Sequence, residues 1–155
     1  MLLIMEDKNI DDLIEITQDS RTVLNYPLEF VEPFKNYLID SFKIKRILEN
    51  KITLIDVDIH GNKRGYISFS LVSNSTIEVN YLFVSSKHQR QNVGYSLLNE
   101  CENISKKFNV NKIVIAAETR SINFYFKQGY ILTDRSLKSS VIPEIFYPYV
   151  EKYLN

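Results

Sequence analysis

Apolar and polar positions recur with two different periods along this chain, and the changes of period divide it into elements. Residues 2–5 form a short apolar run that predicts a strand. Asp7 or Asn9 can cap a first helix, which begins near Ile10. From residue 27 to about residue 48, apolar side chains fall at helical spacing and predict a second helix.

Three strand-like runs follow, at residues 52–59, 64–72 and 76–84. The segments between them are short and rich in turn-forming residues, so these strands are expected to be antiparallel neighbours. A long amphipathic helix begins after His88. Residues 112–117 then form a buried strand that the chain reaches through this helix, and such a crossover predicts a strand parallel to residues 76–84.

The C-terminal quarter predicts one more helix and two more strands. A short helix around residues 121–128 is expected to end at Gly129, which can serve as its C-cap. Residues 130–134 predict a strand. The aromatic segment 144–154 is either a strand or a helix, and Pro148 would confine a strand here to the edge of the sheet.

The predicted order is therefore β-α-α-β-β-β-α-β-α-β-β, an α/β (α+β) fold with a mixed, mostly antiparallel sheet flanked by helices. This order is neither a doubly wound nucleotide-binding fold nor a barrel. The chain also contains no G-x-G-x-x-G and no G-x-x-x-x-G-K-[ST] motif, so the dinucleotide-binding and P-loop interpretations are excluded.

Composition indicates one soluble domain that spans residues 1–155, with 45% hydrophobic and 25% charged residues. A formal net charge of zero disfavours nucleic acid as a partner. The single cysteine excludes an internal disulfide, and two distant histidines without a cysteine pair predict no metal. The first residues carry no signal-peptide pattern and no apolar run could span a bilayer, so we expect a cytoplasmic protein without a membrane partner.

The stretch HQRQNVGYSLL joins the strand at 76–84 to the long helix. A helix N-terminus exposes unpaired backbone N–H groups and the positive end of the helix dipole, which suits an anion such as phosphate. The alternative is an ordinary strand-to-helix turn. With the predicted order of elements, residues 89–94 (QRQNVG) resemble the [QR]-x-x-G-x-[GA] loop of the GNAT superfamily of N-acetyltransferases, which holds the pyrophosphate of acetyl-coenzyme A. Asn92 stands where glycine is usual, and asparagine tolerates the left-handed backbone conformation.

Two further segments resemble the same superfamily, and the resemblance covers about residues 50–153. Residues 82–84 (LFV) resemble the strand whose backbone pairs with the pantetheine arm. Residues 121–130 (SINFYFKQGY) resemble the motif A-x-x-F-Y-x-x-x-G-F, although Glu118 replaces an asparagine often seen before it. A GNAT-like fold is thus implied, with acetyl-CoA as co-substrate and the following residues at its site: Leu82, Phe83, Val84, Gln89, Arg90, Gln91, Asn92, Val93, Gly94, Tyr95, Ser121 and Phe124.

The resemblance implies direct transfer of an acetyl group from acetyl-CoA to a primary amine in a ternary complex. Such a transfer needs a base, an oxyanion donor and an acid. Glu78 is the candidate base because it lies six positions before Val84, as in the histone-acetyltransferase branch. Alternation places Glu78 on one strand face with Leu82 and Val84, unless a bulge intervenes. A solvent-facing glutamate is the open alternative, and Glu118 is a second candidate base.

Tyr125 is the candidate acid, because the tyrosine of the family's F-Y pair points at the thioester sulfur, and the backbone N–H of Phe83 is the candidate oxyanion donor. Other reactive residues have simpler interpretations. Cys101 falls on the apolar face of its helix, which predicts an inert thiol in the core. His60 falls in a hairpin turn, which predicts an exposed side chain. His88 borders the phosphate loop, where a phosphate contact is one interpretation.

Aromatic residues in segments 20–43 and 144–154 are expected to form the acceptor side of the site. They suit an amine on an apolar or peptide-like carrier, and they would equally suit a core or a homodimer interface. Because Asn92 and Glu118 depart from the family pattern, a catalytically silent acyl-CoA-binding sensor or interaction module is the alternative function.

Overall fold

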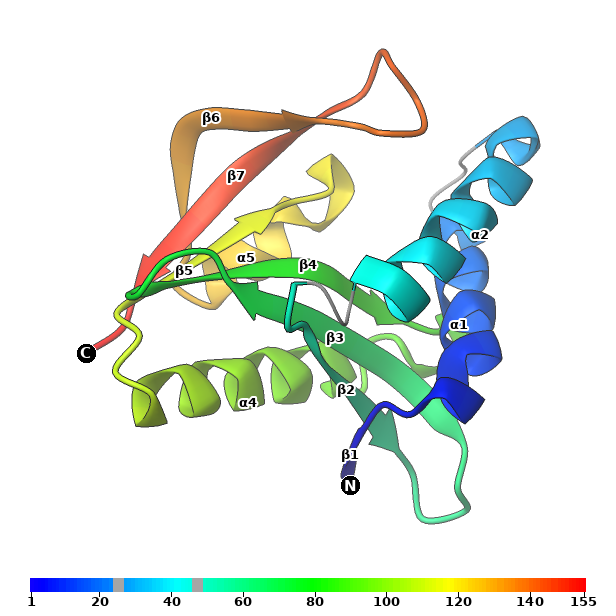
Figure 1. Ribbon diagram of the computed structural model, residues 1–155, viewed down its shortest axis with the longest axis horizontal. Helices are drawn as coiled ribbons and strands as arrows, with labels where there is room; N and C mark the ends of the chain where they lie inside the picture. Colours follow the sequence, from blue (N-terminus) through cyan, green and yellow to red (C-terminus); the bar gives the residue numbers. More distant parts are fainter. Residues whose placement is uncertain (24–26, 46–48) are drawn as a thin grey trace.

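A seven-stranded mixed sheet runs through the centre of the molecule in the computed structural model, which describes residues 1–23, 27–45 and 49–155 (Figure 1). The strand order is β1-β2-β3-β4-β5-β7-β6. Within the described residues all neighbouring strands are antiparallel except β4 and β5, which are parallel, so the predicted fold class is confirmed. The strands are β1 (Leu2–Ile4), β2 (Ile52–Val57), β3 (Lys63–Leu71), β4 (Thr76–Val84), β5 (Lys112–Ala116), β6 (Ile131–Lys138) and β7 (Phe146–Tyr153).

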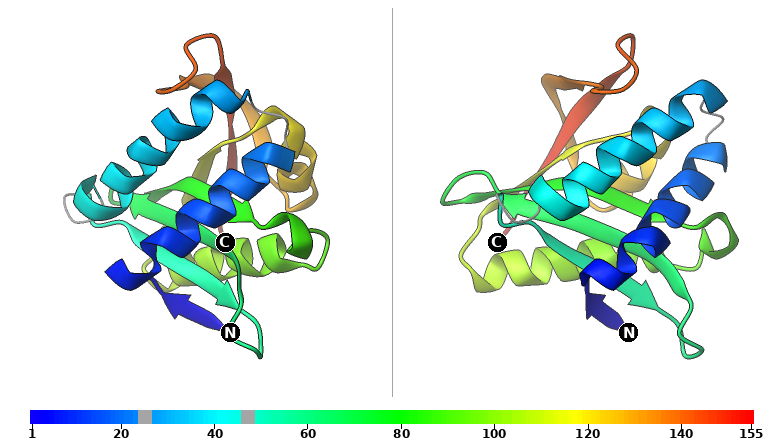
Figure 2. Two further views of the ribbon diagram at one scale, coloured as in Figure 1. Left: turned by 90° about the vertical axis from the view of Figure 1, so that its right-hand side faces the viewer. Right: turned by 45° about the vertical axis from the view of Figure 1, so that its right-hand side comes forward.

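Helices cover both faces of this sheet (Figures 1 and 2). Helices α1 and α2 pack on one face, and α4 and α5 pack on the other. The longer helices are α1 (Ile10–Val23), α2 (Val31–Asp40), α4 (Val93–Lys107) and α5 (Ile122–Lys127). Short helical turns are η1 (Asp7–Asn9), η2 (Leu28–Phe30), η3 (Ser41–Lys45), η4 (Ser86–His88) and η5 (Thr119–Ser121).

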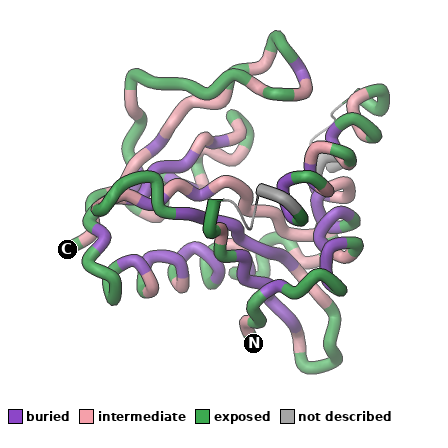
Figure 3. Tube along the Cα trace, viewed as in Figure 1, coloured by how far each residue is buried: buried purple, intermediate pink, exposed green. Residues whose placement is uncertain are grey.

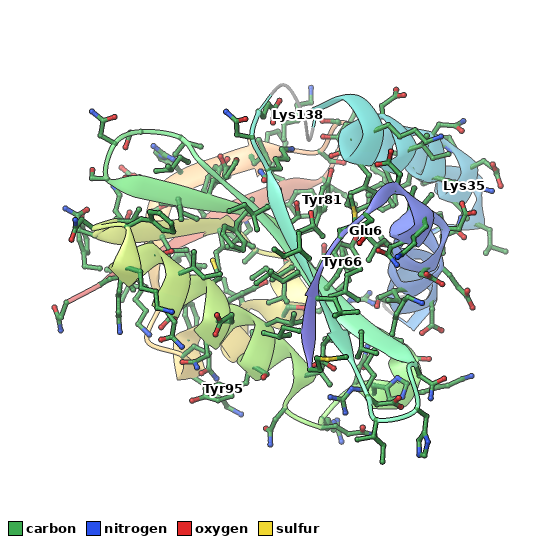
Figure 4. All side chains as sticks on the ribbon, turned by 60° about the horizontal axis from the view of Figure 1, so that its bottom comes forward. Glu6, Lys35, Tyr66, Tyr81, Tyr95 and Lys138 are labelled. Atoms are coloured by element: carbon green, nitrogen blue, oxygen red, sulfur yellow. The ribbon has the colours of Figure 1, made fainter. Side chains whose placement is uncertain are left out.

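The core is divided by the sheet into two apolar clusters, and burial is concentrated in the central strands and the helix faces that cover them (Figure 3). On the α4 side, Leu97 and Leu98 pack against strand residues such as Ile113. On the α1 and α2 side, Tyr66 and Tyr81 lie between the sheet and the two helices (Figure 4). Both faces of the central strands are therefore buried, which explains why residues 113–117 form one continuous apolar run.

The first two helices differ from their predicted limits. The N-cap of the first turn is Glu6 rather than Asp7 or Asn9, and Asn9 instead accepts the Glu6 N–H on its Oδ1 at 3.0 Å. The second helix ends as regular α-helix at Asp40 and continues as one π-helical turn, η3. The rest of the predicted helix, residues 46–48, lies outside the described residues.

The C-terminal segment is a strand, but the prediction that Pro148 confines it to a sheet edge is wrong. Strand β7 lies between β5 and β6. The carbonyl of Pro148 accepts a hydrogen bond from the N–H of Ala117 at 2.8 Å. In an antiparallel pair the nitrogen and carbonyl of one residue face the same neighbouring strand, so the Pro148 nitrogen also faces β5. Proline has no N–H to donate, and because β5 ends at Ala116, this lack falls at the end of the pairing between β5 and β7. The C-cap of α5 is Gln128 rather than the predicted Gly129, which follows it with φ +90°, the left-handed conformation in which helices commonly end.

A bulge in β4 determines which side chains face which helix layer. Tyr81 pairs with Ser68 and Val79 pairs with Phe69, which leaves Asn80 without a partner residue on β3. Ile77 and Val79 pack on the α4 side before the bulge, and Leu82 and Val84 pack there after it. Glu78 therefore faces the α1 and α2 side, and the expectation that it shares a face with Leu82 and Val84 is wrong.

Strands β4 and β5 diverge at the C-terminal end of β4. Their parallel pairing runs from Thr76 and Lys112 to Val79 and Ile115. Beyond that point β4 continues to Val84 with β3 as its neighbour on one edge. The other edge of β4 is open, so the sheet contains a gap that both helix layers can reach.

Candidate active site

A cleft of about 750 Å³ occupies the gap between β4 and β5, and its walls come from both helix layers. Both candidate catalytic residues line it. Gln91 is absent from the lining; it lies beside a smaller hollow and donates from Nε2 to the carbonyl of Lys87 at 3.2 Å. The predicted residues that line the cleft are Glu78, Leu82, Phe83, Val84, Gln89, Arg90, Asn92, Val93, Gly94, Tyr95, Ser121, Phe124 and Tyr125.

The loop at residues 89–94 presents the N-terminus of α4 to this cleft. Asn92 is the N-cap and has φ 62°, the left-handed conformation that its residue type predicts. Arg90 adopts the same conformation, also with φ 62°. The first intrahelical bond runs from the N–H of Ser96 to the carbonyl of Asn92 at 2.9 Å, so the N–H groups of residues 93–95 have no acceptor within the helix. These groups make the loop suitable for an anion.

Gly94 leaves room in the cleft wall. A Cβ at this position would lie 3.5 Å from Phe124 and 3.6 Å from Val84, which is ordinary van der Waals contact. Packing of the chain itself therefore does not require glycine here. Both neighbours also line the cleft, so the space that a Cβ would fill stays open to a ligand.

Along the open edge of β4, the backbone groups of Leu82 and Val84 face away from β3 and toward the gap. The N–H of Ser85 donates to the carbonyl of Arg64 on β3 at 2.9 Å. Because N–H groups alternate between the two edges of a strand, the N–H of Phe83 also faces β3. Our expectation that Phe83 supplies the oxyanion donor is therefore wrong, and the N–H of Leu82 faces the gap instead.

Helix α1 holds the end of β4 in place. The Ser20 hydroxyl donates to the carbonyl of Val84, and the Asp19 carboxylate accepts both the backbone N–H and the hydroxyl of Ser86. His88 lines the cleft, and its Nδ1 lies 2.7 Å from the Ser85 hydroxyl. The roles of Asp19 and Ser20 could not be found from the sequence, because they belong to no motif and lie more than sixty positions from their partners.

Tyr125 reaches the cleft from α5 with a hydroxyl that is free to bond a ligand. Its ring packs against Phe124 and Tyr130, with centroids 5.2 and 6.0 Å away, and the residue is only 6% exposed. Across residues 1–23, 27–45 and 49–155, no hydrogen bond to the Tyr125 hydroxyl is found. Burial and, secondarily, the Glu118 carboxylate raise the pKa of Tyr125, so this phenol stays protonated at neutral pH.

Glu78 reaches the cleft from the opposite face of the sheet, held by Tyr149 of β7. The Tyr149 hydroxyl donates to Glu78 Oε1 at 3.0 Å, and the Arg135 guanidinium lies 5.1 Å from the centroid of the Tyr149 ring. Burial, with the Glu78 carboxylate as second cause, raises the pKa of Tyr149 to about 12. Tyr149 therefore remains a donor at neutral pH. The sequence indicated an aromatic segment here, but not this contact.

The wall of the cleft on the α1 and α2 side, where we expect the acceptor, is aromatic. Segment 144–154 contributes Tyr147, and residues 24–26 of the other predicted segment lie outside the described residues. The connection between β6 and β7 contributes Val141 and Ile142, which no motif had indicated. The aromatic residues of this wall are Phe30, Phe34, Tyr37, Tyr81, Phe83 and Tyr147.

The other reactive residues lie apart from the cleft. Cys101 is buried, and burial raises the pKa of its thiol to about 12, as an inert core thiol requires. His60 is exposed, as its turn predicts. Among the described residues there is no group of His, Cys, Asp and Glu side chains that could hold a metal ion. In the same part of the chain, no helix is long and apolar enough to cross a membrane.

Comparison with known proteins extends this picture. The sequence model of the acetyltransferase (GNAT) family matches residues 10–130. No curated protein is significantly similar in sequence. Among solved structures, a GCN5-related N-acetyltransferase from Rhodopseudomonas palustris is 21% identical with a TM-score of 0.79, and the match covers 99% of this chain and 95% of that one.

Two further structures resemble the chain along its whole length. A GNAT-family acetyltransferase from Staphylococcus aureus Mu50 is 17% identical with a TM-score of 0.79, covering 100% of this chain and 99% of the other. The PaiA N-acetyltransferase of Thermoplasma acidophilum, solved in complex with coenzyme A, is 19% identical with a TM-score of 0.76, covering 99% of each chain. At these identities the structural likeness concerns the fold.

Proposed function

Because this chain belongs to the GNAT family of acetyltransferases, we propose that it transfers an acetyl group from acetyl-CoA to a primary amine, with both substrates bound together. Acetyl-CoA-dependent acyl transfer is the general activity of the family; the amine acceptor and the direct transfer are our proposal. One observation carries it. Glu78 and Tyr125 line the same cleft from opposite faces of the sheet, beside the exposed N-terminus of α4.

The residues of the cleft fit acetyl-CoA, which would supply the acetyl group as an activated thioester. The unpaired N–H groups at the start of α4 suit its pyrophosphate, and Gly94 leaves space beside them. The open backbone edge at Leu82 and Val84 suits a pantetheine arm, which carries amide groups that can pair with a strand. The hydroxyl of Tyr125 reaches the cleft from α5, without a protein partner in the described part of the chain.

Glu78 would prepare the amine. A lysine-type ammonium has a pKa of about 10.4 and must lose a proton before its nitrogen can attack. Glu78 would take that proton, directly or through a water molecule, while Tyr149 holds Oε1 and leaves Oε2 to the acceptor. In the net reaction the amine nitrogen bonds to the acetyl carbon and the carbon–sulfur bond breaks. The nitrogen loses two protons in all: one would leave to solvent through Glu78, and the other balances the proton that the sulfur gains.

Two other groups would stabilise the charges that this step creates. The N–H of Leu82 faces the gap and would donate to the acetyl oxygen as negative charge grows there. Tyr125 would give its hydroxyl proton to the departing sulfur and later recover one from solvent. Its raised pKa keeps the hydroxyl protonated, so this donor would be present when the carbon–sulfur bond breaks.

The test is thiol release from acetyl-CoA in the presence of a panel of amines that includes amino acids, polyamines and lysine-containing peptides. We expect amine-dependent release of free CoA and an N-acetylated product in the mass spectrum. Coenzyme A binding without turnover of any amine would instead support the silent acyl-CoA-binding module, the alternative raised by Asn92 and Glu118.

A further inference from the structure

A lysine with a buried side chain lines the cleft and has no part in the proposed reaction. Lys51 directly precedes β2, and its side chain is only 7% exposed. Its Nζ lies 3.1 Å from Glu49 Oε2, and the Glu49 side chain is 51% exposed. No other interaction of the Lys51 ammonium occurs within the described residues. An ammonium has three donors, so within this part of the chain most of its hydrogen-bonding capacity has no acceptor.

This arrangement costs stability, which suggests that a ligand compensates for it. Burial of a charge is unfavourable unless the charge is paired and hydrogen-bonded. A half-exposed carboxylate such as that of Glu49 is partly hydrated and compensates only in part. An anionic group in the cleft would complete the environment of the ammonium.

Lys51 lies in line with the candidate base. Ile52 pairs with Phe69, and extending this register by one residue places Lys51 opposite Ser70. Ser70 in turn pairs with Glu78. Neighbouring strands are about 4.8 Å apart, which places the Cα atoms of Lys51 and Glu78 about 10 Å from each other. Ile55 packs on the α1 and α2 side, and alternation places Lys51 on that side, the same side as Glu78.

The residues around Lys51, Ser70 and Glu78 indicate what else a ligand here would contact. Asn80, the bulged residue of β4, lines the cleft beside Glu78, and the hydroxyl of Ser70 lies 3.5 Å from its Oδ1. The aromatic wall, including Phe34, Tyr37 and Tyr81, closes the space from the helix side. A ligand here meets a carboxylate, a cation and an apolar surface.

We propose that the acceptor is a free amino acid with an apolar side chain. Its amine would lie at Glu78, its carboxylate would pair with Lys51, and its side chain would pack on the aromatic wall. A single ammonium matches the one negative charge of a carboxylate, whereas a phosphate monoester carries about two at neutral pH. This assignment rests on the proposed acetyl transfer and adds the substrate class to it.

The test compares L-phenylalanine with L-phenylalaninamide, which lacks the carboxylate charge. Rates are measured above the pKa of both amines, so that amine basicity does not decide the comparison. A hydrogen bond to a charged group contributes about 1.5–3 kcal/mol, which corresponds to about ten- to hundredfold in kcat/KM. The wild-type enzyme should prefer phenylalanine by this factor, and Lys51→Met should abolish the preference through a higher KM for phenylalanine.

Two variants serve as controls. Lys51→Arg keeps the positive charge and should retain part of the preference. Lys63→Met removes a lysine that is also ion-paired, with Nζ 3.1 Å from Asp12 Oδ2, but that does not line the cleft, and it should change neither substrate. An equal or better rate with the amide in the wild type would overturn the proposal, as would an equal loss on both substrates in Lys51→Met.

Thermal unfolding with coenzyme A separates this proposal from the one on which it rests. If coenzyme A stabilises the wild type and Lys51→Met alike but phenylalanine is not acetylated, the acceptor class is wrong and the acetyl-CoA site stands. If coenzyme A stabilises neither protein and no amine is acetylated, the proposed function fails and the acceptor class fails with it.

Discussion

At the scale of single residues, the proton transfers that we propose are divided between two side chains with different environments. Tyr125 is buried and keeps its proton, so Tyr125→Phe should reduce kcat by about 10²-fold, within the usual range for a general acid. Coenzyme A affinity should stay nearly unchanged, because the phenyl ring keeps its packing against Phe124 and Tyr130. Steady-state kinetics and calorimetry check both parts. A wild-type kcat in the variant would remove Tyr125 from the mechanism.

Glu78 and Tyr149 are joined by a hydrogen bond, and replacing each of them should change the reaction rate in a different way. Glu78→Gln should lower the rate most near neutral pH, and the defect should shrink at higher pH, where free amine is already abundant. Tyr149→Phe should lower kcat less, by about tenfold, because Glu78 Oε1 loses the donor that holds it in place. An unchanged profile in Glu78→Gln would transfer the role of base to Glu118 or to bound water.

The raised pKa of Tyr149 also has a consequence for stability. Its pKa increases from 10.0 to about 12 on folding, so the protonated form is favoured in the folded state. This contribution is fully present below pH 10 and is lost as the pH rises from about 10 to 12. The hydrogen bond to Glu78 is therefore intact throughout the range in which the enzyme would be assayed.

At the scale of elements, the turn between η4 and α4 is the proposed binding site for the pyrophosphate. Asn92 makes no side-chain capping bond and adopts φ 62°, so Asn92→Gly removes a side chain without unpairing the helix. We expect the variant to bind coenzyme A as well as the wild type or more tightly, as measured by calorimetry. Asn109→Gly is the matched control, because Asn109 has φ 57° after α4 and does not line the cleft. A marked loss of affinity in Asn92→Gly alone would show that the Asn92 amide donates to the ligand.

At the scale of the whole molecule, the divergence of β4 from β5 opens the sheet to both helix layers. A ligand in this gap contacts only the folded state, so coenzyme A should stabilise the protein by mass action. At a concentration a hundredfold above its Kd, the melting temperature should rise by about 5–10 °C. Inorganic pyrophosphate at the same concentration controls for a general anion effect. The acetyl-CoA assignment would be wrong if coenzyme A gave neither a thermal shift nor a calorimetric signal.

Much of the fold and part of the site could be predicted from the sequence, because they depend on neighbours along the chain. The order of helices and strands follows from the local period of apolar residues, and the observed order is the predicted one. The turns at Asn92 and Gly129 follow from residue types that tolerate positive φ. The same locality explains why the sequence could point to residues 89–94, residues 82–84 and Tyr125 as lining residues of one cleft, since each belongs to a contiguous motif.

Only the tertiary structure decided how these segments meet. The bulge at Asn80 turned Glu78 away from the face of Leu82 and Val84, and the register with β3 directed the N–H of Leu82 into the gap instead of that of Phe83. The contact of Tyr149 with Glu78 and the place of Lys51 in the cleft likewise join distant parts of the chain. The physical reason is common to all of them: strand register depends on hydrogen bonds and packing between segments far apart in the sequence, and one residue of shift changes which groups face the site.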